Sequence, residues 1–310
     1  MPHPVIIDCD PGHDDALALL LAAGDSRLRL LGVTTVAGNQ TLDKTTRNAQ
    51  RILALAGAGD VPVAAGCDRP LVGELAVADY IHGPSGLDGP DLDVPVTPVA
   101  EEHAVELTRR LVTESAEPVT LIALGPLTNV ALLLRTHPEI RSRVRRIVFM
   151  GGSTERGNTT PYGEFNIVTD PEAADIVVRS GLPLTMVGLN VTHQVRATAG
   201  IIAEFQSLGS RTGRVCAELM TFFAGAYLRN FALGDPPVHD PVAVACVLDP
   251  ALVQTVTAPL AIELAGTCTR GATVVDLHHR TGRADNAQIA VGIDVEAFWR
   301  TLMKAVSRYT

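Results

Sequence analysis

The sequence is poor in several residue types, and each shortage limits what the protein can be. Its five cysteines are an odd number, widely spaced and without a C-x-x-C pair, which is neither a disulfide framework nor a zinc pattern and favours a reducing cytosol. Lysine and arginine number 25 against 34 aspartates and glutamates, a formal charge of −9. The chain therefore lacks the basic field that a binder of nucleic acid or of a membrane surface needs.

Long apolar runs are also missing. No uninterrupted stretch reaches the roughly 18 residues that a membrane span requires, and the opening "MPHPVIID" enters a strand without a basic segment or cleavage site. We therefore expect a cytoplasmic protein that binds neither nucleic acid nor a membrane. Hydrophobic residues still make up 46% of the chain, enough for a sizeable core. Since no linker, repeat or low-complexity segment interrupts the pattern, we expect one domain over residues 1–310.

Strand-like and helix-like patterns alternate through the first two-thirds of the chain. Their apolar runs are continuous rather than alternating, which is typical of strands buried on both faces. We expect an α/β fold with a doubly wound, mainly parallel sheet and helices on both faces. The predicted strands are 5–7, 27–36, 61–66, 119–125, 145–152 and 182–189, and the predicted helices are 14–23, 41–57, 104–115, 127–136 and 171–181.

The last third follows a different pattern. Residues 199–231 look helical, and another helix is expected after His239–Asp240. Three strand-like stretches then occur without helices between them, which predicts a small antiparallel addition before a closing helix at 294–309. These stretches are 258–266, 272–277 and 286–293.

Ligands of a doubly wound sheet bind outside the carboxyl ends of its strands, so the residues that follow each strand are the candidates. After the first, second, fourth and fifth strands these are rich in carboxylates and amides and poor in cations. Two loops, 66–98 and 151–170, are longer than simple connections, and loops of that length in a compact domain are usually functional or disordered.

The first strand is followed by four aspartates within eight positions: Asp8, Asp10, Asp14 and Asp15. Asp14 could be a helix cap with the others solvated, because a helix N-terminus favours negative charge. Four carboxylates this close repel one another unless a cation neutralises them. A hard divalent cation held by oxygen atoms is the stronger interpretation, and no pair of histidines or cysteines competes for a softer metal.

The stretch "DCDPGHDDALAL" resembles the signature D-x-D-P-G-x-D-D of the inosine–uridine nucleoside hydrolases. Six further motifs follow in that family's order: "VAGN" (36–39), "HGPSGLDG" (82–89), "LGPLTNVA" (124–131), "MGG" (150–152), "GNTTPYGEFNIVTDPEAA" (157–174) and "PPVHDPVAVA" (236–245). The resemblance implies an enzyme that hydrolyses the N-glycosidic bond of ribonucleosides to free base and ribose. It also implies a homotetramer or a homodimer.

The resemblance implies a bound Ca²⁺ that also takes the two ribose hydroxyls and a water. Its ligands here would be Asp10, Asp15, Asp240 and the main-chain carbonyl of Leu124, where the family often has threonine. Asp10 would be the general base toward that water. An acidic pocket suits this reaction, because cleavage passes through a cation-like sugar.

Further residues match the family's substrate contacts. The expected ribose-binding residues are Asp14, Asn39, Asn158, Glu164 and Asn166, although "GN" and "EFN" alone could be ordinary turn and cap residues. Met150 is also expected to contact the substrate. His239 resembles the family's candidate acid for the leaving base, and His82 a second histidine near the base. Phe223 and Tyr227, with Phe231, share one helix face and could stack on the base or pack in the core. His13 is expected to pack beneath its loop, and no role is assigned to His103, His137, His193, His278 or His279.

The preferred base is inferred from resemblance alone. Cys9 and His13 inside the first motif, with His82 and His239, resemble the branch that prefers uridine and cytidine. A purine-preferring branch commonly stacks the base on tryptophan, whereas the one tryptophan here, Trp299, lies in the closing helix. A purine or broad-specificity hydrolase remains the main alternative.

Two more distant alternatives stay open. A haloacid dehalogenase-type phosphatase also begins with D-x-D after a strand, but Asp14 and Asp15 would repel a phosphate. A non-catalytic nucleoside-binding protein could keep the fold, although a competent residue fills each expected catalytic position.

Overall fold

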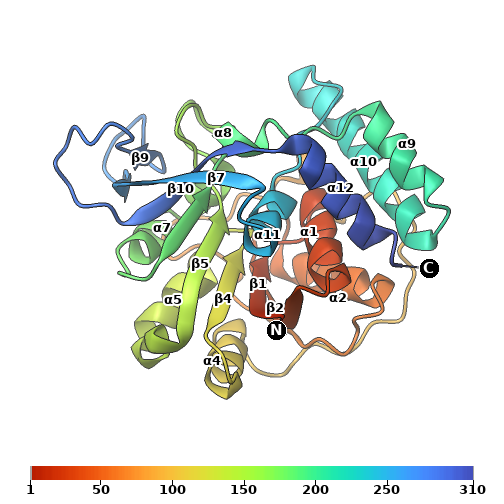
Figure 1. Cartoon of the computed structure of the whole chain (residues 1–310), viewed down its shortest axis with the longest axis horizontal. Coiled ribbons are helices and arrows are strands. Elements are labelled where there is room, and N and C mark those ends of the chain that lie inside the picture. The colour runs from red at the N-terminus through yellow and green to blue at the C-terminus, as the bar shows by residue number, and fades with distance from the viewer. Residues whose placement is uncertain (1, 310) are drawn as a thin grey trace.

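The computed structural model describes residues 2–309. Its centre is an eight-stranded sheet with the order β3-β2-β1-β4-β5-β6-β10-β7 (Figure 1). Neighbouring strands are parallel except for β10 and β7, which are antiparallel. The strands are β1 (His3–Cys9), β2 (Leu28–Thr35), β3 (Val63–Ala65), β4 (Val119–Ala123), β5 (Val144–Met150), β6 (Leu184–Val187), β7 (Val253–Ala258) and β10 (Ala287–Ile293).

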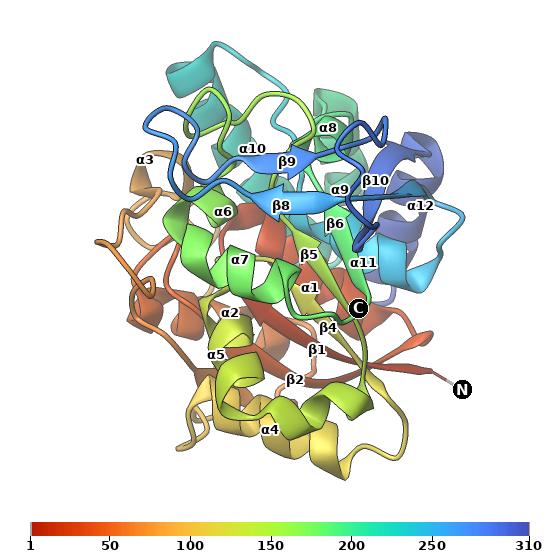
Figure 2. The ribbon, with the colours of Figure 1, turned by 90° about the vertical axis from the view of Figure 1, so that its left-hand side faces the viewer.

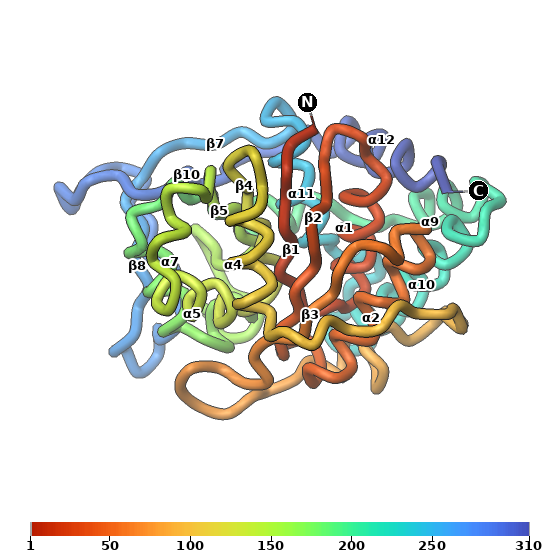
Figure 3. The backbone as a smooth tube through the Cα atoms, turned by 90° about the horizontal axis from the view of Figure 1, so that it is seen from below, coloured from red at the N-terminus to blue at the C-terminus, as the bar shows by residue number. Residues whose placement is uncertain are grey.

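Helices cover both faces of this sheet (Figure 3). The alternation of side chains along β1 shows why: Val5 and Ile7 belong to one hydrophobic cluster and Ile6 to the other. One face carries α1 (His13–Gly24), α2 (Leu42–Leu55), α11 (Asp240–Leu248) and α12 (Val295–Val306), and the other α4 (Ala104–Glu114), α5 (Thr128–Thr136) and α7 (Pro171–Val178). Shorter or outlying helices are α3 (Asp79–His82), a 3₁₀ helix (Pro138–Arg143), α6 (Phe165–Thr169), α8 (Leu189–Thr192), α9 (Ala199–Ser207) and α10 (Arg211–Phe231).

The predicted doubly wound α/β fold is confirmed. The chain builds outward from β1 to β3 in one direction and from β4 to β6 in the other, so the strand order reverses between β1 and β4. A crevice forms at such a reversal because the connections on its two sides leave toward opposite faces of the sheet. The segments after β1 and β4 therefore meet at one place.

The C-terminal part differs from the prediction in two respects. β10 is not part of a separate addition, since it joins the main sheet between β6 and β7. β7 was not predicted, because four of its six residues are exposed on an edge strand and it has no continuous apolar run. The separate antiparallel unit consists of β8 (Leu260–Ile262) and β9 (Thr273–Val275) alone, above α7 in Figure 2.

The predicted helical stretch 199–231 is divided into α9 and α10. The break is at Gly209, whose φ of +70° is comfortable for glycine but not for other residues. Ser210 then caps α10 by accepting a hydrogen bond from the Gly213 N–H at 3.0 Å. No helix within residues 2–309 is long and apolar enough to cross a membrane.

Candidate active site

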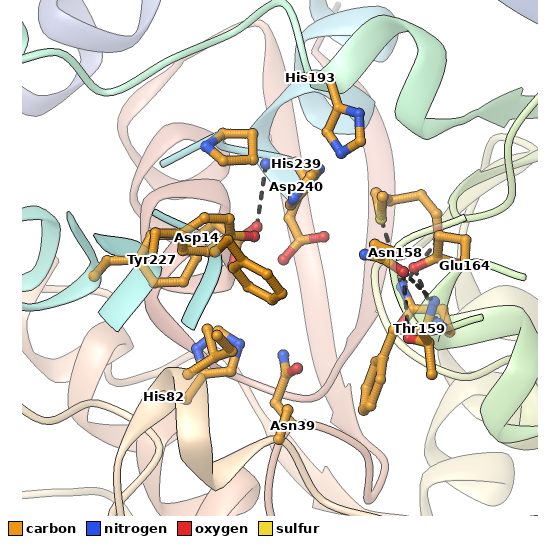
Figure 4. Close-up of a pocket in the computed structure, with 18 of the residues that line it drawn as sticks. Asp14, Asn39, His82, Asn158, Thr159, Glu164, His193, Tyr227, His239 and Asp240 are labelled. Carbon is orange, nitrogen blue, oxygen red and sulfur yellow. Dashed lines mark hydrogen bonds between the residues drawn. The ribbon is translucent and has the colours of Figure 1, made fainter. Parts of the chain in front are cut away.

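A cleft of about 370 Å³ opens at the carboxyl ends of the central strands. Residues that lie far apart in the sequence converge on it (Figure 4). Asp10 and Asp15 are fully buried beneath its floor and do not line it. The expected site residues that line it are Asp14, Asn39, His82, Leu124, Met150, Asn158, Glu164, Asn166, Phe223, Tyr227, His239 and Asp240.

The carboxylates of the floor are held by backbone N–H groups. The Asp10 Oδ2 accepts a hydrogen bond from the Asn39 N–H at 2.7 Å. Asp15, in the first turn of α1, accepts from the Gly12 N–H at 2.9 Å, and Asp14 accepts from the His239 N–H at 3.1 Å. These bonds fix the carboxylates in place and favour their charged forms.

Glycines make room for the Asp10 side chain. A Cβ at Gly38 or Gly125 would overlap the Asp10 carboxylate. Each glycine belongs to a motif that follows a strand, "VAGN" after β2 and "LGPLTN" after β4. The glycine of each motif therefore lets the backbone approach the carboxylate closely.

The floor concentrates negative charge that the described residues leave uncompensated. Oxygen atoms of Asp14, Asp15 and Asp240 all lie within 4.8 Å of one another. The Oδ1 atoms of Asp10 and Asp15 are buried without a hydrogen-bond partner. Burial, followed by repulsion from neighbouring carboxylates, raises the pKa of Asp15 to about 7 and those of Asp10 and Asp240 well above the usual range. Such an all-oxygen cluster fits a hard cation.

Asn166 connects the ends of two strands beside this cluster. Its Nδ2 donates to the main-chain carbonyl of Leu124 at 2.7 Å and to that of Met150 at 3.2 Å. These carbonyls follow β4 and end β5, so one amide sets the spacing between the two segments. The Leu124 carbonyl, which we expected to be a metal ligand, therefore lies in a fixed position.

Asn158 and Glu164 also have local structural roles, those of ordinary turn and cap residues. Glu164 caps α6, and its carboxylate accepts from the N–H groups of Gly152, Asn166 and Ile167 at 2.9, 3.0 and 3.2 Å. Burial raises its pKa to about 7 against the opposing effect of these bonds. The Asn158 Oδ1 accepts from the Phe165 N–H at 2.9 Å. Both residues also line the cleft, so the cap role and a ligand contact are compatible.

Two expected histidines lie on different sides of the cleft. His239 shares a 2.7 Å hydrogen bond between its Nδ1 and the Thr192 hydroxyl, while its buried Nε2 has no partner. The Nδ1 of His82 lies 3.1 Å from the His13 Nδ1 and 3.3 Å from the His13 backbone nitrogen. Burial lowers the pKa of His239 to about 4 and that of His82 below its usual range, so both rings are neutral.

An aromatic wall lies beside His82. Phe223 stacks on the His82 and His13 rings with centroid distances of 5.4 and 5.2 Å. Tyr227 meets Phe223 edge-on at 4.9 Å, and Phe231 lies 5.2 Å from Tyr227. The wall runs from buried Phe223 to Phe231, which is 44% exposed. It thus offers an apolar surface from the interior to the mouth.

The position of His13 matches the expectation that it packs beneath its loop, since it is buried and its Nε2 lies 2.9 Å from the Asp88 carbonyl oxygen. Asp8 lies behind the floor and does not line the cleft. Its Oδ1 accepts hydrogen bonds from the Thr34 hydroxyl at 2.6 Å and from the Asn129 Nδ2 at 2.8 Å. Asp8 therefore bonds to residues of neighbouring segments.

Three basic residues at the mouth were missed. His193, to which no role was assigned, lines the cleft together with Arg156 and Arg196, so the expectation of a cation-poor edge is wrong for the mouth. Burial is the largest cause that lowers the pKa of His193 to about 4, and the nearby His239 and the two arginines lower it further. Two of the three, His193 and Arg196, follow β6, so their place after a strand is the sequence signal that indicates them.

The chain has close relatives along its whole length. Residues 5–300 match the family described as inosine-uridine preferring nucleoside hydrolase. The chain is 47% identical over 311 residues to the pyrimidine-specific ribonucleoside hydrolase RihA of Photobacterium profundum, covering 100% of both. It is 46% identical to the protein of that name in Shewanella sp. (strain ANA-3), covering 100% of this chain and 98% of the relative.

Solved structures have the same fold. A purine-preferring ribonucleoside hydrolase from Gardnerella vaginalis superposes with a TM-score of 0.91 at 34% identity, covering 99% of this chain and 98% of the other. A plant nucleoside hydrolase, the PpNRh1 enzyme, superposes with a TM-score of 0.93 at 31% identity, covering 99% of each chain.

Proposed function

Because the chain belongs to the inosine-uridine preferring nucleoside hydrolase family and is therefore a ribonucleoside hydrolase, we propose that it prefers the pyrimidine ribonucleosides uridine and cytidine. It would release the free base and ribose. The observation that carries this proposal is the 47% identity over full length to a relative named pyrimidine-specific. The purine-preferring neighbour is less similar, at 34%.

The composition of the cleft supports the same preference. Trp299 does not line the cleft, since it packs against Phe205 and Phe298 at ring-centroid distances of 6.3 and 5.2 Å. The base would instead lie against Phe223 and Tyr227.

We propose Ca²⁺ as the metal, with Asp10, Asp15, Asp240 and the Leu124 carbonyl as its ligands. The donor set supports a hard cation because it consists of oxygen atoms, and because two buried carboxylate oxygens have no other partner. When bound, the ion would offset the charge of the floor and lower the pKa of a water that it coordinates.

Asp10 is positioned for general base catalysis. Its Oδ2 is held by the Asn39 N–H, which orients the carboxylate, and Asp10 would take a proton from the water that attacks the anomeric carbon. The negative floor favours the positive charge that develops on the sugar. Asp14, Asn39, Asn158, Glu164 and Asn166 would hold the ribose, and Met150 would contact the substrate.

The departing base would meet the two histidines. In the tautomer of His239 whose Nδ1 accepts the Thr192 hydroxyl proton, the Nε2 N–H of the neutral ring can donate a hydrogen bond to the leaving base. The His13 Nε2 donates to the Asp88 carbonyl, so the neutral His13 ring accepts at Nδ1, and the His82 Nδ1, 3.1 Å away, carries the His82 proton. The Nε2 of His82 would then accept a hydrogen bond from an N–H group of the base.

The test is release of free ribose from uridine, cytidine, inosine and adenosine, before and after exhaustive chelation. We expect uridine or cytidine to react fastest, chelation to abolish turnover and lower the melting temperature, and Ca²⁺ to restore both. Preference for inosine would overturn the base assignment, and unchanged turnover after chelation would overturn the metal. Light scattering of the same preparation tests the expected homotetramer or homodimer.

A further inference from the structure

His13 does not line the cleft, yet it contacts a histidine that does. Its ring and that of His82 are both buried. The His13 Nε2 lies 2.9 Å from the Asp88 carbonyl oxygen, and the His13 Nδ1 lies 3.1 Å from the His82 Nδ1. The other nitrogen of His82, Nε2, has no hydrogen-bond partner among residues 2–309. The two contacts therefore connect a backbone carbonyl to a side chain of the cleft.

The Asp88 carbonyl is held in place by its own loop. The Asp88 carboxylate accepts hydrogen bonds from the Ser85 N–H at 2.9 Å and from the Ser85 hydroxyl. The Asp88 N–H donates to the His82 carbonyl at 3.4 Å. A Cβ at Gly12 would lie 2.5 Å from the His82 Nδ1, so glycine at this position lets His82 pack against the start of α1. Both ends of the loop that faces His13 are thus fixed.

The His13 ring is held by aromatic packing as well. It stacks on Phe222 and on Phe223 at a centroid distance of 5.2 Å in each case, with interplanar angles of 4° and 3°. Within the described residues, neither His13 nor His82 forms an ion pair. Burial without a charged partner favours the neutral form of both rings.

These contacts decide which nitrogen of each neutral ring carries the proton. A carbonyl oxygen can only accept, so the His13 Nε2 is a donor and the His13 Nδ1 an acceptor. The facing Nδ1 of His82 then carries its proton, because two bare nitrogens 3.1 Å apart would repel each other. The His13 N–H favours the opposite His82 tautomer, but its contact with the same Nδ1 is longer, at 3.3 Å.

The His82 tautomer determines which group of a base it can bind. With the proton on Nδ1, the Nε2 of His82 is an acceptor. The uracil ring of uridine has one N–H group, at N3, and its two carbonyl oxygens can only accept. His82 and Tyr227 lie on the same side of the cleft, where the proposed function places the base (Figure 4). An accepting His82 can therefore bind uracil through N3–H.

We propose that His13 is a positioning residue for the base, which holds His82 in the tautomer whose Nε2 accepts a hydrogen bond from the uracil N3–H. This inference rests on the proposed function, since it requires a uracil base beside His82. The hydrogen bond forms equally in the ground and transition states, so losing it should raise KM and leave kcat nearly unchanged.

The tautomer can be measured without a substrate. Solid-state NMR of protein with ¹⁵N-labelled histidine distinguishes protonated from bare ring nitrogens, and the variant His82→Gln assigns the His82 signals. We expect a protonated Nδ1 and a bare Nε2 in the wild type. In His13→Leu we expect the reverse, because only the backbone N–H of residue 13 is left of the two contacts with Nδ1. A protonated Nε2 of His82 in the wild type would overturn the inference.

Kinetics test the contact with the base by comparing uridine with 3-methyluridine, in which a methyl group replaces the N3 proton. We expect His13→Leu to raise KM for uridine about 10-fold, since His82 would then present a donor to a donor, and to change kcat less than about 2-fold. The kcat/KM for 3-methyluridine should change less than about 2-fold, because this base has no N3–H to lose. Equal losses on both substrates would give His13 a merely structural role and contradict the inference.

Two further variants separate hydrogen bonding from packing. In His13→Gln, the amide can donate to the Asp88 carbonyl and accept from the His82 Nδ1, so KM for uridine should stay within about 3-fold of the wild type. Phe222→Leu is the packing control, because it removes a ring stacked on His13 and leaves the hydrogen bonds of His13 in place. It should change KM less than about 2-fold. A rise in KM as large as that in His13→Leu would assign His13 to packing.

The two measurements also distinguish failure of this inference from failure of the proposed function. If the wild type does not cleave uridine, the proposed function fails, and the NMR spectrum still decides the His82 tautomer. If it cleaves uridine and His82 carries its proton on Nε2, the proposed function stands and this inference is wrong. Melting temperatures show whether each variant folds. Should His13→Leu unfold, the wild-type spectrum decides the outcome.

Discussion

The floor and the mouth of the cleft come from different parts of the fold. Carboxylates of the floor follow strands or begin helices, are buried, and accept hydrogen bonds from backbone N–H groups. Residues of the mouth come from long loops and from the C-terminal end of α10, and several are exposed. A floor fixed by the sheet suits chemistry shared across a family, whereas a mouth built from loops can vary with the substrate.

Among substitutions in the cleft, one in the floor should lower the turnover rate most. Asp10→Asn keeps the shape of the side chain but cannot take a proton, so kcat for uridine should fall about 10³-fold or more. The fold should persist, because an amide oxygen can still accept the Asn39 N–H and the change removes one charge from a repelling cluster. Ribose release and thermal melting measure the two effects.

Asp8→Asn is the matched control. Asp8 is a buried aspartate two residues earlier, but it bonds to Thr34 and Asn129 and does not line the cleft. We expect its kcat to stay within about 10-fold of the wild type, because Asp8 does not line the cleft and its charge raises the pKa of Asp10 less than those of Asp15 and Asp14 do. Equal losses in both variants would mean that the floor acts only as a scaffold.

The difference between floor and mouth also explains which site residues could be predicted from the sequence. Asp10 and Asp15 could be expected to lie close together because both follow the first strand within a few residues, where chain geometry is local. Asp240 was placed with them only through the resemblance of its motif to the family. The main sheet up to β6 was predictable from its apolar runs. β7 was not, since its exposed residues carry no such run and its place depends on pairing with β10, about 30 residues later.

The mouth was predictable only in part. Phe223 and Tyr227 share a helix face at a spacing of four, which sequence periodicity reveals. Arg196 reaches the cleft because its segment forms a bridge with Pro237, about 40 residues along the chain. That long-range pairing leaves no periodic signal in either segment, so the arginine and its neighbour His193 were missed.

A substitution of His239 should lower the turnover rate by an intermediate factor. His239→Ala removes the proposed donor to the departing base, so kcat for uridine should fall about 10²-fold with a smaller change in KM. A riboside with p-nitrophenolate as leaving group needs no such proton, and its hydrolysis should be nearly unaffected. Steady-state kinetics on both substrates make the comparison. Equal losses on the two would assign His239 to positioning, through the hydrogen bond between its ring and the Thr192 hydroxyl.

The smallest effect should come from the aromatic wall. Tyr227→Leu keeps an apolar side chain but removes the ring beside the base, and base–aromatic stacking contributes about 1–3 kcal/mol, so KM for uridine should rise roughly 10-fold. The kcat should change little, because the stack forms equally in the ground and transition states. Tyr162→Leu is the control, since Tyr162 is 55% exposed and does not line the cleft. A loss in kcat as large as that in KM would show that the wall orients the base for cleavage, and the division between a catalytic floor and a recognising mouth would then fail.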